Sequence, residues 1–313
     1  MDISSDRPVV SIIMANFNGA HWLREAIRSI QMQTLKNWEL IIADDASTDE
    51  SLNIIGDAVA SDHRIKVLPA DRNQGPSAAR NRALQHASGY WLTIIDSDDT
   101  IEPSRLNLLV EAANSYSLAI VADDLISIDE SLPGVRSTLL GLNAMKYIDT
   151  VEFVKNGIKL GYLKPMIRAD CVAEIRYDER LRAGEDFDFL LRAIFSVGHM
   201  AIFPAMGYNY RIHRGSVSRS TESARQKIAD MIEADVRFCE SHKIGKALLN
   251  ACNRRRELLK TRIHWLDLKG ELRQRRFISV FYNLIAHPRV VFPATYSLWW
   301  RLVGMRIKQA AGR

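Results

Sequence analysis

The sequence predicts an α/β protein with a mostly parallel central sheet flanked by helices, followed by a helical, basic C-terminal extension. Short β-branched apolar runs alternate with helical patterns over about the first hundred residues, which is typical of a parallel sheet covered on both faces. Charge also divides the chain. Residues 253–313 carry 14 Lys and Arg against 3 Asp and Glu, whereas the first 252 residues carry 28 against 34. We therefore expect a large domain over residues 1–220 and a basic helical region over 221–313.

Four strands and three helices are expected in the first hundred residues. Apolar runs predict strands at 9–14, 39–43, 65–68 and 90–95. Helical patterns follow the first three, starting after Asn16-Phe17-Asn18-Gly19, after Ser47-Thr48 and at Gly75-Pro76-Ser77. Ligands of such sheets bind beyond the carboxyl ends of the strands. The polar clusters after strands one, two and four therefore mark the candidate site.

The middle of the chain has a less regular pattern. A strand is expected over 118–122, ending at Asp123-Asp124, and a loop over 131–141. A helix with one apolar face is expected over 186–196, followed by a polar, aromatic loop over 208–218. From about residue 222 the pattern is helical.

Composition disfavours several classes of protein. The best candidate for a membrane span, residues 290–300, contains Pro293 and is shorter than the roughly 18 apolar residues that a span needs. The polar start of the chain, residues 1–8, has no signal-peptide core. Three cysteines without a C-x-x-C spacing disfavour disulfides and zinc and favour a reducing cytoplasm.

The most informative motif is Asp96-Ser97-Asp98-Asp99, directly after the fourth predicted strand. Its three carboxylates repel one another, and nothing in the local sequence neutralises them. Mg²⁺ or Mn²⁺ would do so and would also hold a diphosphate, because both ions prefer oxygen ligands. The alternative is a turn with an Asp helix cap before Glu102-Pro103. We expect metal and ribose binding here, and hence a nucleotide-linked substrate.

Two clusters after the first and second strands are candidates for contacts to a nucleotide. Asp44 and Asp45 offer carboxylates that accept a hydrogen bond from a uracil ring N–H, although a capped turn explains them equally well. Phe17 offers an aromatic face for stacking on a base, with Asn16 and Asn18 as polar neighbours. The alternative for Phe17 is an ordinary place in the core.

Two further positions, both near predicted helix starts, are candidates for the chemistry. Arg80 is expected to contact a phosphate, which its guanidinium suits, or else to face solvent. Glu185 and Asp186 form the predicted catalytic pair, in which Asp186 is a general base that takes a proton from a sugar hydroxyl. Acidic residues in a first helical turn are also favourable through the helix dipole alone.

The segment Tyr210-Arg211-x-His213 adds a cation and an imidazole in the predicted loop. His213 is either a surface histidine or a further metal ligand, and Arg211 is either exposed or a clamp on a leaving diphosphate. A loop that closes on a bound donor excludes water and limits hydrolysis.

The basic C-terminal region contains aromatic residues interleaved with Arg and Lys. This pattern predicts peripheral contact with an anionic membrane, and a solvated helix is the alternative. Nucleic acid is disfavoured as a partner, because no nucleic-acid fold signature accompanies the charge. The aromatic residues are Trp265, Phe277, Phe281, Tyr282, Trp299 and Trp300.

Taken in order, these motifs resemble those of the family 2 glycosyltransferases, which have the Rossmann-like GT-A fold. The resemblance covers about residues 9–218. It implies that Asp96-x-Asp98 is the DxD motif, with Asp98 nearest the ion, and that Asp186 is the base of an inverting transfer. It also implies a nucleotide-sugar half over about 1–100 and an acceptor half over about 101–220. Its motifs are Val10-Ser11-Ile12-Ile13 with Asn18, Asp44-Asp45-x-Ser47-x-Asp49, Gly75-x-x-x-Ala79-Arg80-Asn81, Asp96-x-Asp98-Asp99, Glu185-Asp186 and Tyr210-Arg211-x-His213.

The chain departs from the family pattern at two points. Ala15 and Phe17 stand where the family usually has Pro and Tyr, so the stacking face is kept but a hydroxyl is lost. The Gln-x-x-Arg-Trp motif of processive synthases is absent from the sequence, which argues for addition of a single sugar.

The resemblance implies a metal-dependent transfer of a hexose from a UDP-sugar to a saccharide hydroxyl. More loosely, the chain is similar to bacterial exopolysaccharide enzymes of the succinoglycan type, which extend a lipid-linked oligosaccharide at the inner membrane face. That similarity implies a cytoplasmic protein, peripheral at the membrane. One alternative is a sugar-1-phosphate nucleotidyltransferase, although the Gly-rich, Arg-containing loop expected of it is not found after the first strand. The other is a membrane-docking scaffold without catalytic activity.

Overall fold

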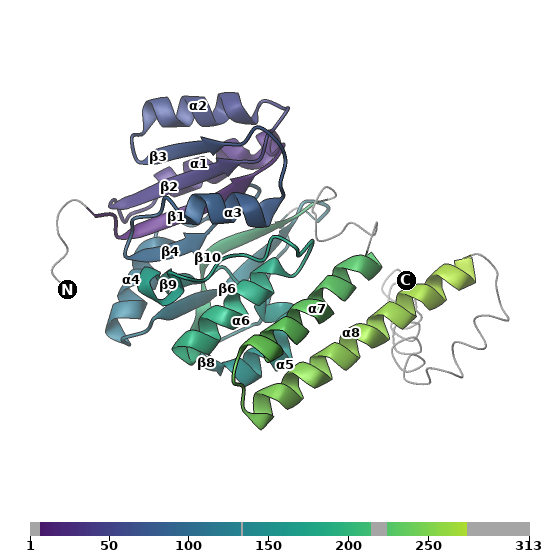
Figure 1. Cartoon of the computed structure of the whole chain (residues 1–313). Helices are drawn as coiled ribbons and strands as arrows, with labels where there is room; N and C mark the ends of the chain where they lie inside the picture. The colour runs from purple at the N-terminus through teal and green to yellow at the C-terminus, as the bar shows by residue number, and fades with distance from the viewer. Residues whose placement is uncertain (1–6, 133, 214–223, 274–313) are drawn as a thin grey trace, which may run out of the picture. The chain divides into compact units, whose positions relative to one another are not determined.

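The computed structural model describes residues 7–132, 134–213 and 224–273. The chain divides into two compact units, residues 1–220 and 221–313. The first unit contains a mixed sheet with its helices, and the described part of the second contains two long helices (Figure 1).

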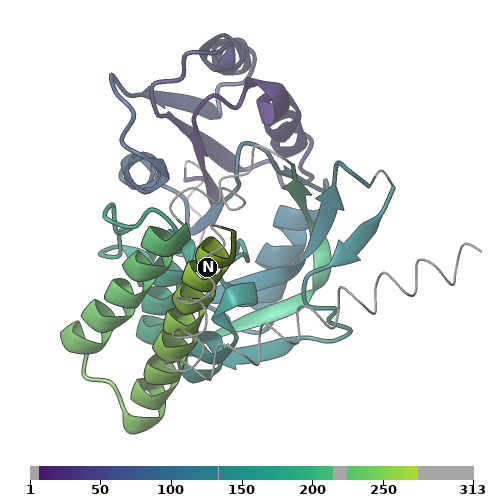
Figure 2. The same ribbon diagram turned by 90° about the vertical axis from the view of Figure 1, so that its right-hand side faces the viewer.

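A parallel sheet forms the first part of unit one. Its strands are β1 (Val10–Asn16), β2 (Trp38–Asp44), β3 (Ile65–Pro69) and β4 (Trp91–Ile94), in the order β3-β2-β1-β4. The helices between them are α1 (Ala20–Gln31), α2 (Ser51–Ser61) and α3 (Pro76–Leu84). Helices α1 and α3 lie on opposite faces of these strands, as the two views show together (Figures 1 and 2). The predicted alternation of strands and helices is confirmed.

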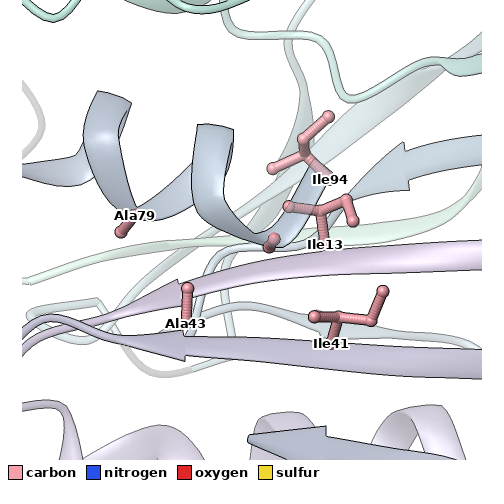
Figure 3. Packing of buried hydrophobic residues seen from close by; sticks show 6 residues of the cluster. Ile13, Ile41, Ala43, Ala79 and Ile94 are labelled. Atoms are coloured by element: carbon pink, nitrogen blue, oxygen red, sulfur yellow. The ribbon is translucent and has the colours of Figure 1, made fainter. Parts of the chain in front are cut away.

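The strand register fixes both the core and the candidate site. Ile13 of β1 pairs with Ile41 of β2 on one side and with Ile94 of β4 on the other. Ala79 of α3 packs onto this apolar layer, and its small side chain lets the helix approach the strands closely (Figure 3). The same register pairs Asn16 with Asp44, so the carboxyl ends of β1 and β2 meet at one edge.

The sheet continues beyond β4 through mixed strands, in the order β4-β9-β6-β10-β5. Strand β9 is antiparallel to both neighbours, whereas β6 and β10 are parallel to each other. The elements are β5 (Thr100–Ile101), α4 (Arg105–Ser115), β6 (Ile120–Asp129), β7 (Arg136–Thr138), β8 (Lys146–Asp149), α5 (Thr150–Leu160), β9 (Met166–Arg168), the 3₁₀ helix η1 (Ala169–Val172), α6 (Glu185–Val197) and β10 (His199–Ile212).

Strand β6 is longer than the sequence pattern indicates. It does not end at Asp123-Asp124, because both carboxylates are buried and satisfied inside the fold. Asp123 pairs with Arg105, and Asp124 accepts backbone N–H groups from Leu140 and Gly141. The loop expected over 131–141 also contains the short strand β7.

The prediction of a loop over 208–218 is wrong for residues 208–212, which belong to β10. Tyr208 pairs with Leu125 of β6, and Ile212 pairs with Asp129. Between Phe203 and Tyr208 the register shifts, so β10 bulges before it reaches the site. Gly207 lies in this bulge with φ 116°, and a Cβ there would stand 2.4 Å from that of Glu102. The rest of the predicted loop, residues 214–218, lies outside the described residues.

Unit two contains the helices α7 (Ala224–Ser241) and α8 (Lys246–Arg273). They run antiparallel to each other, because ion pairs join Arg225 to Asp267 and Asp235 to Arg255. None of the helices in the described ranges has both the length and the apolar character needed to cross a bilayer. Of the interleaved aromatic residues, Phe277, Phe281, Tyr282, Trp299 and Trp300 lie outside those ranges, as does the apolar stretch 290–300.

Candidate active site

A set of hydrogen-bonded polar residues links the carboxyl ends of β1 and β2. Asn16 Nδ2 donates to Asp44 Oδ2 at 2.8 Å, and Ser47 donates its backbone N–H to Asp44 Oδ1 at 2.9 Å. Asn18 has a φ of 51° and accepts the backbone N–H of Thr48 at 2.8 Å. Asp44 is fully buried, so these contacts give no support to the predicted contact between Asp44 and a nucleotide. The group shapes the edge on which Phe17 stands.

Phe17 and Asp45 follow neighbouring strand ends and present suitable groups for a nucleobase. The Phe17 side chain is 50% exposed, so the interpretation of Phe17 as a core residue is wrong. Asp45 Oδ2 accepts the backbone N–H groups of Gln74 and Gly75 at 2.9 and 2.7 Å. Its Oδ1 atom is buried and has no hydrogen-bond partner among the described residues. An exposed ring and a carboxylate oxygen that is buried without a hydrogen-bond partner among the described residues thus lie at the same edge of the sheet.

The carboxylates of Asp96-Ser97-Asp98-Asp99 point to different partners. Asp96 forms ion pairs with Arg80 at 2.9 Å and with Lys164 at 2.8 Å. Burial by itself would raise the pKa of Asp96, but Lys164 and Arg80 together hold that pKa below its usual range. Nothing in the local sequence neutralises Asp96, but the fold does, through these two cations. Both cations come from positions distant in the sequence.

Asp98 and His213 contact each other at the open side of the loop. Asp98 Oδ2 lies 3.0 Å from His213 Nε2, and the aspartate side chain is 34% exposed. The imidazole is buried against Trp22, with 3.8 Å between ring centroids. Arg211 donates from Nε to the carbonyl oxygen of Asp98 and pairs through Nη2 with Glu25, both at 2.8 Å. The predicted clamp of Arg211 on a diphosphate stays a prediction.

Asp99 is buried and joins the loop to β10. Its Oδ2 accepts the hydroxyl of Tyr208 at 2.8 Å, and its Oδ1 accepts the backbone N–H of Arg211 at 2.7 Å. Burial and the neighbouring Asp96 and Asp98 raise the pKa of Asp99 well above its usual range. Asp99 therefore shapes the loop and does not present a charge to a ligand.

The fit of these residues to a divalent cation rests on Asp98 and His213. Among the described residues, no group of three or more His, Cys, Asp or Glu side chains is arranged to hold a metal ion. The pair offers one carboxylate oxygen and one imidazole nitrogen, 3.0 Å apart. Mg²⁺ is commonly held by one or two carboxylates plus water and substrate phosphates. The carboxylate of Asp98 fits such an ion, although its Oδ2 also contacts His213 Nε2, whereas the predicted ligand Asp96 is engaged with Arg80 and Lys164.

Helix α6 brings Glu185 and Asp186 to the same place as Asp96. Gly184, with φ 83°, turns the chain into the helix just before them. Arg80 lies 3.1 Å from Glu185 Oε1 and 3.3 Å from Asp186 Oδ1, and Lys164 lies 2.7 Å from Asp186 Oδ2. The Asp186 side chain is still 21% exposed. We call this group the carboxylate–cation cluster; its members are Asp96, Glu185, Asp186, Arg80 and Lys164.

Comparison with known proteins shows the family. Residues 11–169 match the model described as Glycosyl transferase family 2. The chain belongs to that family. It is a glycosyltransferase with the GT-A fold, so the resemblance found in the sequence is confirmed and the nucleotidyltransferase alternative is wrong.

Similar proteins cover most of the chain. The succinoglycan biosynthesis protein ExoO of Rhizobium meliloti is 30% identical over 90% of this chain and 82% of its own length. ExoU of the same organism is 28% identical over 89% and 83%. Among solved structures, S. aureus TarS 1-349 in complex with UDP-GlcNAc has a TM-score of 0.64 at 20% identity, covering 77% and 72%. The Pyrobaculum calidifontis mannosyltransferase PcManGT, in complex with GDP-Man and Mn²⁺, has a TM-score of 0.59 at 14% identity, covering 96% and 83%.

Two residues of this family 2 glycosyltransferase were not found by sequence reasoning. Lys164 gives no signal, because a single lysine after an apolar stretch is typical of a surface residue. Asn81 belongs to the quoted motif but had no role; its amide donates to and accepts from the backbone of Tyr177, at 2.9 and 2.7 Å. Because Arg80 also lies over the Tyr177 ring, this segment helps to hold the guanidinium.

Proposed function

We propose that this family 2 glycosyltransferase is an inverting, metal-dependent enzyme. It moves a sugar from a UDP-linked donor onto a hydroxyl of a saccharide acceptor. The observation that supports this best is the carboxylate–cation cluster, in which the predicted base Asp186 and the predicted donor-site residue Asp96 share two cations, Arg80 and Lys164. Two motifs 90 residues apart in the sequence are thereby brought to one place.

The donor occupies the first half of unit one, about residues 1–100, in this proposal. Phe17 stacks on the base, and Asp45 accepts its ring N–H through the unused Oδ1. Asp98 and His213 hold the divalent cation, which offsets charge on the leaving diphosphate. TarS is described in complex with UDP-GlcNAc, and PcManGT in complex with GDP-Man and Mn²⁺. These similarities support a nucleotide-sugar donor and a cation.

Asp186 acts on the acceptor, which binds to the half of unit one formed by about residues 101–220. The acceptor oxygen attacks the anomeric carbon from the side opposite the diphosphate, and its proton passes to the carboxylate of Asp186. The bond from the anomeric carbon to the diphosphate oxygen breaks, so a single displacement inverts the configuration. Glu185 lies beside the base and shares Arg80 with it.

The acceptor is a lipid-linked oligosaccharide of exopolysaccharide biosynthesis in this proposal. Two similar proteins, ExoO and ExoU, are named succinoglycan biosynthesis proteins, and each similarity spans about nine tenths of this chain. The basic region over 221–313 docks on anionic lipid at the inner face of the membrane, where such an acceptor is held.

The test combines a donor screen with a base variant. Calorimetry with UDP-, GDP- and dTDP-sugars, with and without Mn²⁺, identifies the donor. We expect Asp186→Asn to lower transfer at least roughly 10³-fold, because general base catalysis is lost, while donor affinity stays within a few-fold. Exposed Glu174, changed to Gln, is the control for loss of one carboxylate in this half. Transfer at the wild-type rate by Asp186→Asn would refute the role of Asp186 as the base. Donor binding by the wild-type chain without any transfer would favour the scaffold alternative.

A further inference from the structure

Lys164 is a buried cation shared by two carboxylates. Its side chain is 5% exposed, and Nζ lies 2.8 Å from Asp96 Oδ2 and 2.7 Å from Asp186 Oδ2. Burial by itself would lower the pKa of this lysine, but Asp186 and Asp96 raise it above the usual range. The ammonium therefore stays charged and sits between a donor-side group and an acceptor-side group.

The main chain at Lys164 is fixed independently of the site. Arg105 of α4 donates from Nη2 to the carbonyl oxygen of Lys164 at 2.7 Å. The same guanidinium pairs with Asp123 of β6 at 2.8 Å, and both side chains are fully buried. Pro165 follows directly and restricts the backbone further. The lysine thus extends toward the site from a rigid point between a helix and the sheet.

The charge balance of the carboxylate–cation cluster depends on Lys164. Its two cations face three carboxylates, a net charge of −1, and loss of the lysine makes it −2. Arg80 alone cannot replace the contacts, because it already lies between Oδ1 of Asp96, Oδ1 of Asp186 and Oε1 of Glu185. The Oδ2 atoms of both aspartates depend on the lysine.

We propose that Lys164 is a positioning residue for sugar transfer, whose ammonium holds the base Asp186 at a fixed distance from the donor-site carboxylate Asp96. The inference rests on the proposed function, since it takes Asp186 as the base. Each carboxylate oxygen has two acceptor sites, so Asp186 keeps the capacity to accept from a sugar hydroxyl while Lys164 orients it. Lys164 does not react.

A stability cycle tests the contact without any substrate. Lys164→Met is expected to lower Tm by roughly 5 °C or more, because a buried pair loses one partner. Adding Asp186→Asn to that variant is expected to restore part of the loss, because it removes a carboxylate left without its cation. The exposed Lys155, changed to Met, is the matched control and should leave Tm unchanged. Additive losses in Lys164→Met and Asp186→Asn would overturn the proposal.

Kinetics separates positioning from a merely structural role. With the donor found by the screen, Mn²⁺ and membrane extract as the acceptor source, Lys164→Met is expected to lower kcat roughly 10²-fold. Affinity for UDP with Mn²⁺, measured by calorimetry, should stay within threefold, and Lys164→Arg should recover at least part of kcat. Wild-type kcat, or an equal loss of UDP affinity, would overturn the inference. Wild-type transfer by Lys164→Met alongside an inactive Asp186→Asn would sink this inference and leave the proposed function standing.

Discussion

The contact between Asp98 and His213 is the smallest unit on which the proposed chemistry depends. Asp98 is the most exposed of the three aspartates in its loop, and it contacts the imidazole of His213. The ring of Trp22 packs against that imidazole. In the proposed function, this pair holds a cation that also binds phosphate oxygens. The neighbouring carboxylates are already taken by the protein itself, Asp96 by cations and Asp99 by a tyrosine and a backbone N–H.

Replacing either member of this pair should remove the metal dependence of donor binding. We expect Mn²⁺ to tighten UDP binding to the wild-type chain and to have little effect on Asp98→Ala or His213→Ala, because the ion loses a protein ligand. Calorimetry with UDP, with and without Mn²⁺, measures this difference. The control is His86→Ala, because His86 is exposed and its ring contacts only the carbonyl oxygen of Arg82 among the hydrogen bonds of the described residues. An undiminished Mn²⁺ effect in both site variants would place the ion elsewhere.

At the scale of residues, sequence reasoning named the acidic residues of the candidate site together with Arg80 and His213, but not Lys164 or Tyr208. Asp96, Asp98 and Asp186 stand out because clustered carboxylates at strand ends and helix starts are unusual. Lys164 and Tyr208 do not stand out, because nothing in their local sequence shows that the fold buries them against those carboxylates. Charge compensation between distant positions is a property of the tertiary structure.

At the scale of elements, Glu39 links its own strand β2 to the two neighbouring strands, β1 and β3, and to the segment before β4. Its side chain, in β2, is 4% exposed and accepts the hydroxyl of Ser11 from β1 at 2.6 Å. It also accepts the backbone N–H of Ser88, just before β4, at 2.7 Å, and pairs with Lys66 of β3 at 2.8 Å. Burial by itself would raise the pKa of Glu39, but these contacts lower it below the usual value.

The stabilisation by Glu39 should therefore depend on pH. Because the folded-state pKa is lowered, the stabilisation is complete above the unfolded-state value of about 4.3 and is lost as pH falls through the folded-state value. We expect Glu39→Gln to lower the free energy of unfolding by about 1.5–3 kcal/mol at pH 7, with the difference from wild type shrinking in acid. Thermal or urea unfolding across pH measures this. Glu50→Gln, at an exposed position, is the control, and a difference that does not vary with pH would contradict the expectation.

The elements that were predicted correctly carry a strong local pattern. Strands β1 to β4 are short apolar runs, and α6 presents Phe187, Leu190 and Ile194 on one face. The end of β10 was missed because its partner β6 is more than 80 residues away, and pairing between distant segments leaves no local signal. Its alternating Tyr208, Asn209 and Tyr210 follow the two-residue period of a strand but are too polar to suggest one.

At the scale of the whole molecule, charge separates the two units. The proposed donor and acceptor groups lie in the acidic first 252 residues, whereas the net charge of residues 253–313 is +11. Composition alone shows this uneven charge. It did not predict the pairing within unit two, where Arg255 of the run Arg254-Arg255-Arg256 pairs with Asp235. Part of the basic charge is therefore used inside the unit.

The basic region should bind the full chain to anionic membranes. We expect co-sedimentation with vesicles that contain about a third phosphatidylglycerol and little binding to neutral phosphatidylcholine vesicles. Raising the salt from 50 to 500 mM should weaken the binding, because the Debye length falls from about 14 to about 4 Å. A variant with Arg275 and Arg276 changed to Gln should bind less, and one with Arg24 and Arg28 of α1 changed to Gln is the control that removes the same charge. Equal binding to both kinds of vesicle would contradict the docking proposal.

The bulge of β10 has a consequence for changes in chain length. Five residue steps separate Phe203 from Tyr208, while their partners Asp123 and Leu125 on β6 are only two steps apart. The bulge thus adds three residues to β10 relative to β6. Because side chains alternate between the two faces of a strand, changing this number by one would reverse the faces of all the strand residues that follow. Deleting a single residue there would exchange the faces of the strand's last residues, so that Tyr208 and Tyr210 would take the face of Arg211 and Arg211 would take theirs. Except at Gly207, where a Cβ would meet Glu102, this segment should therefore tolerate point substitutions far better than single-residue insertions or deletions.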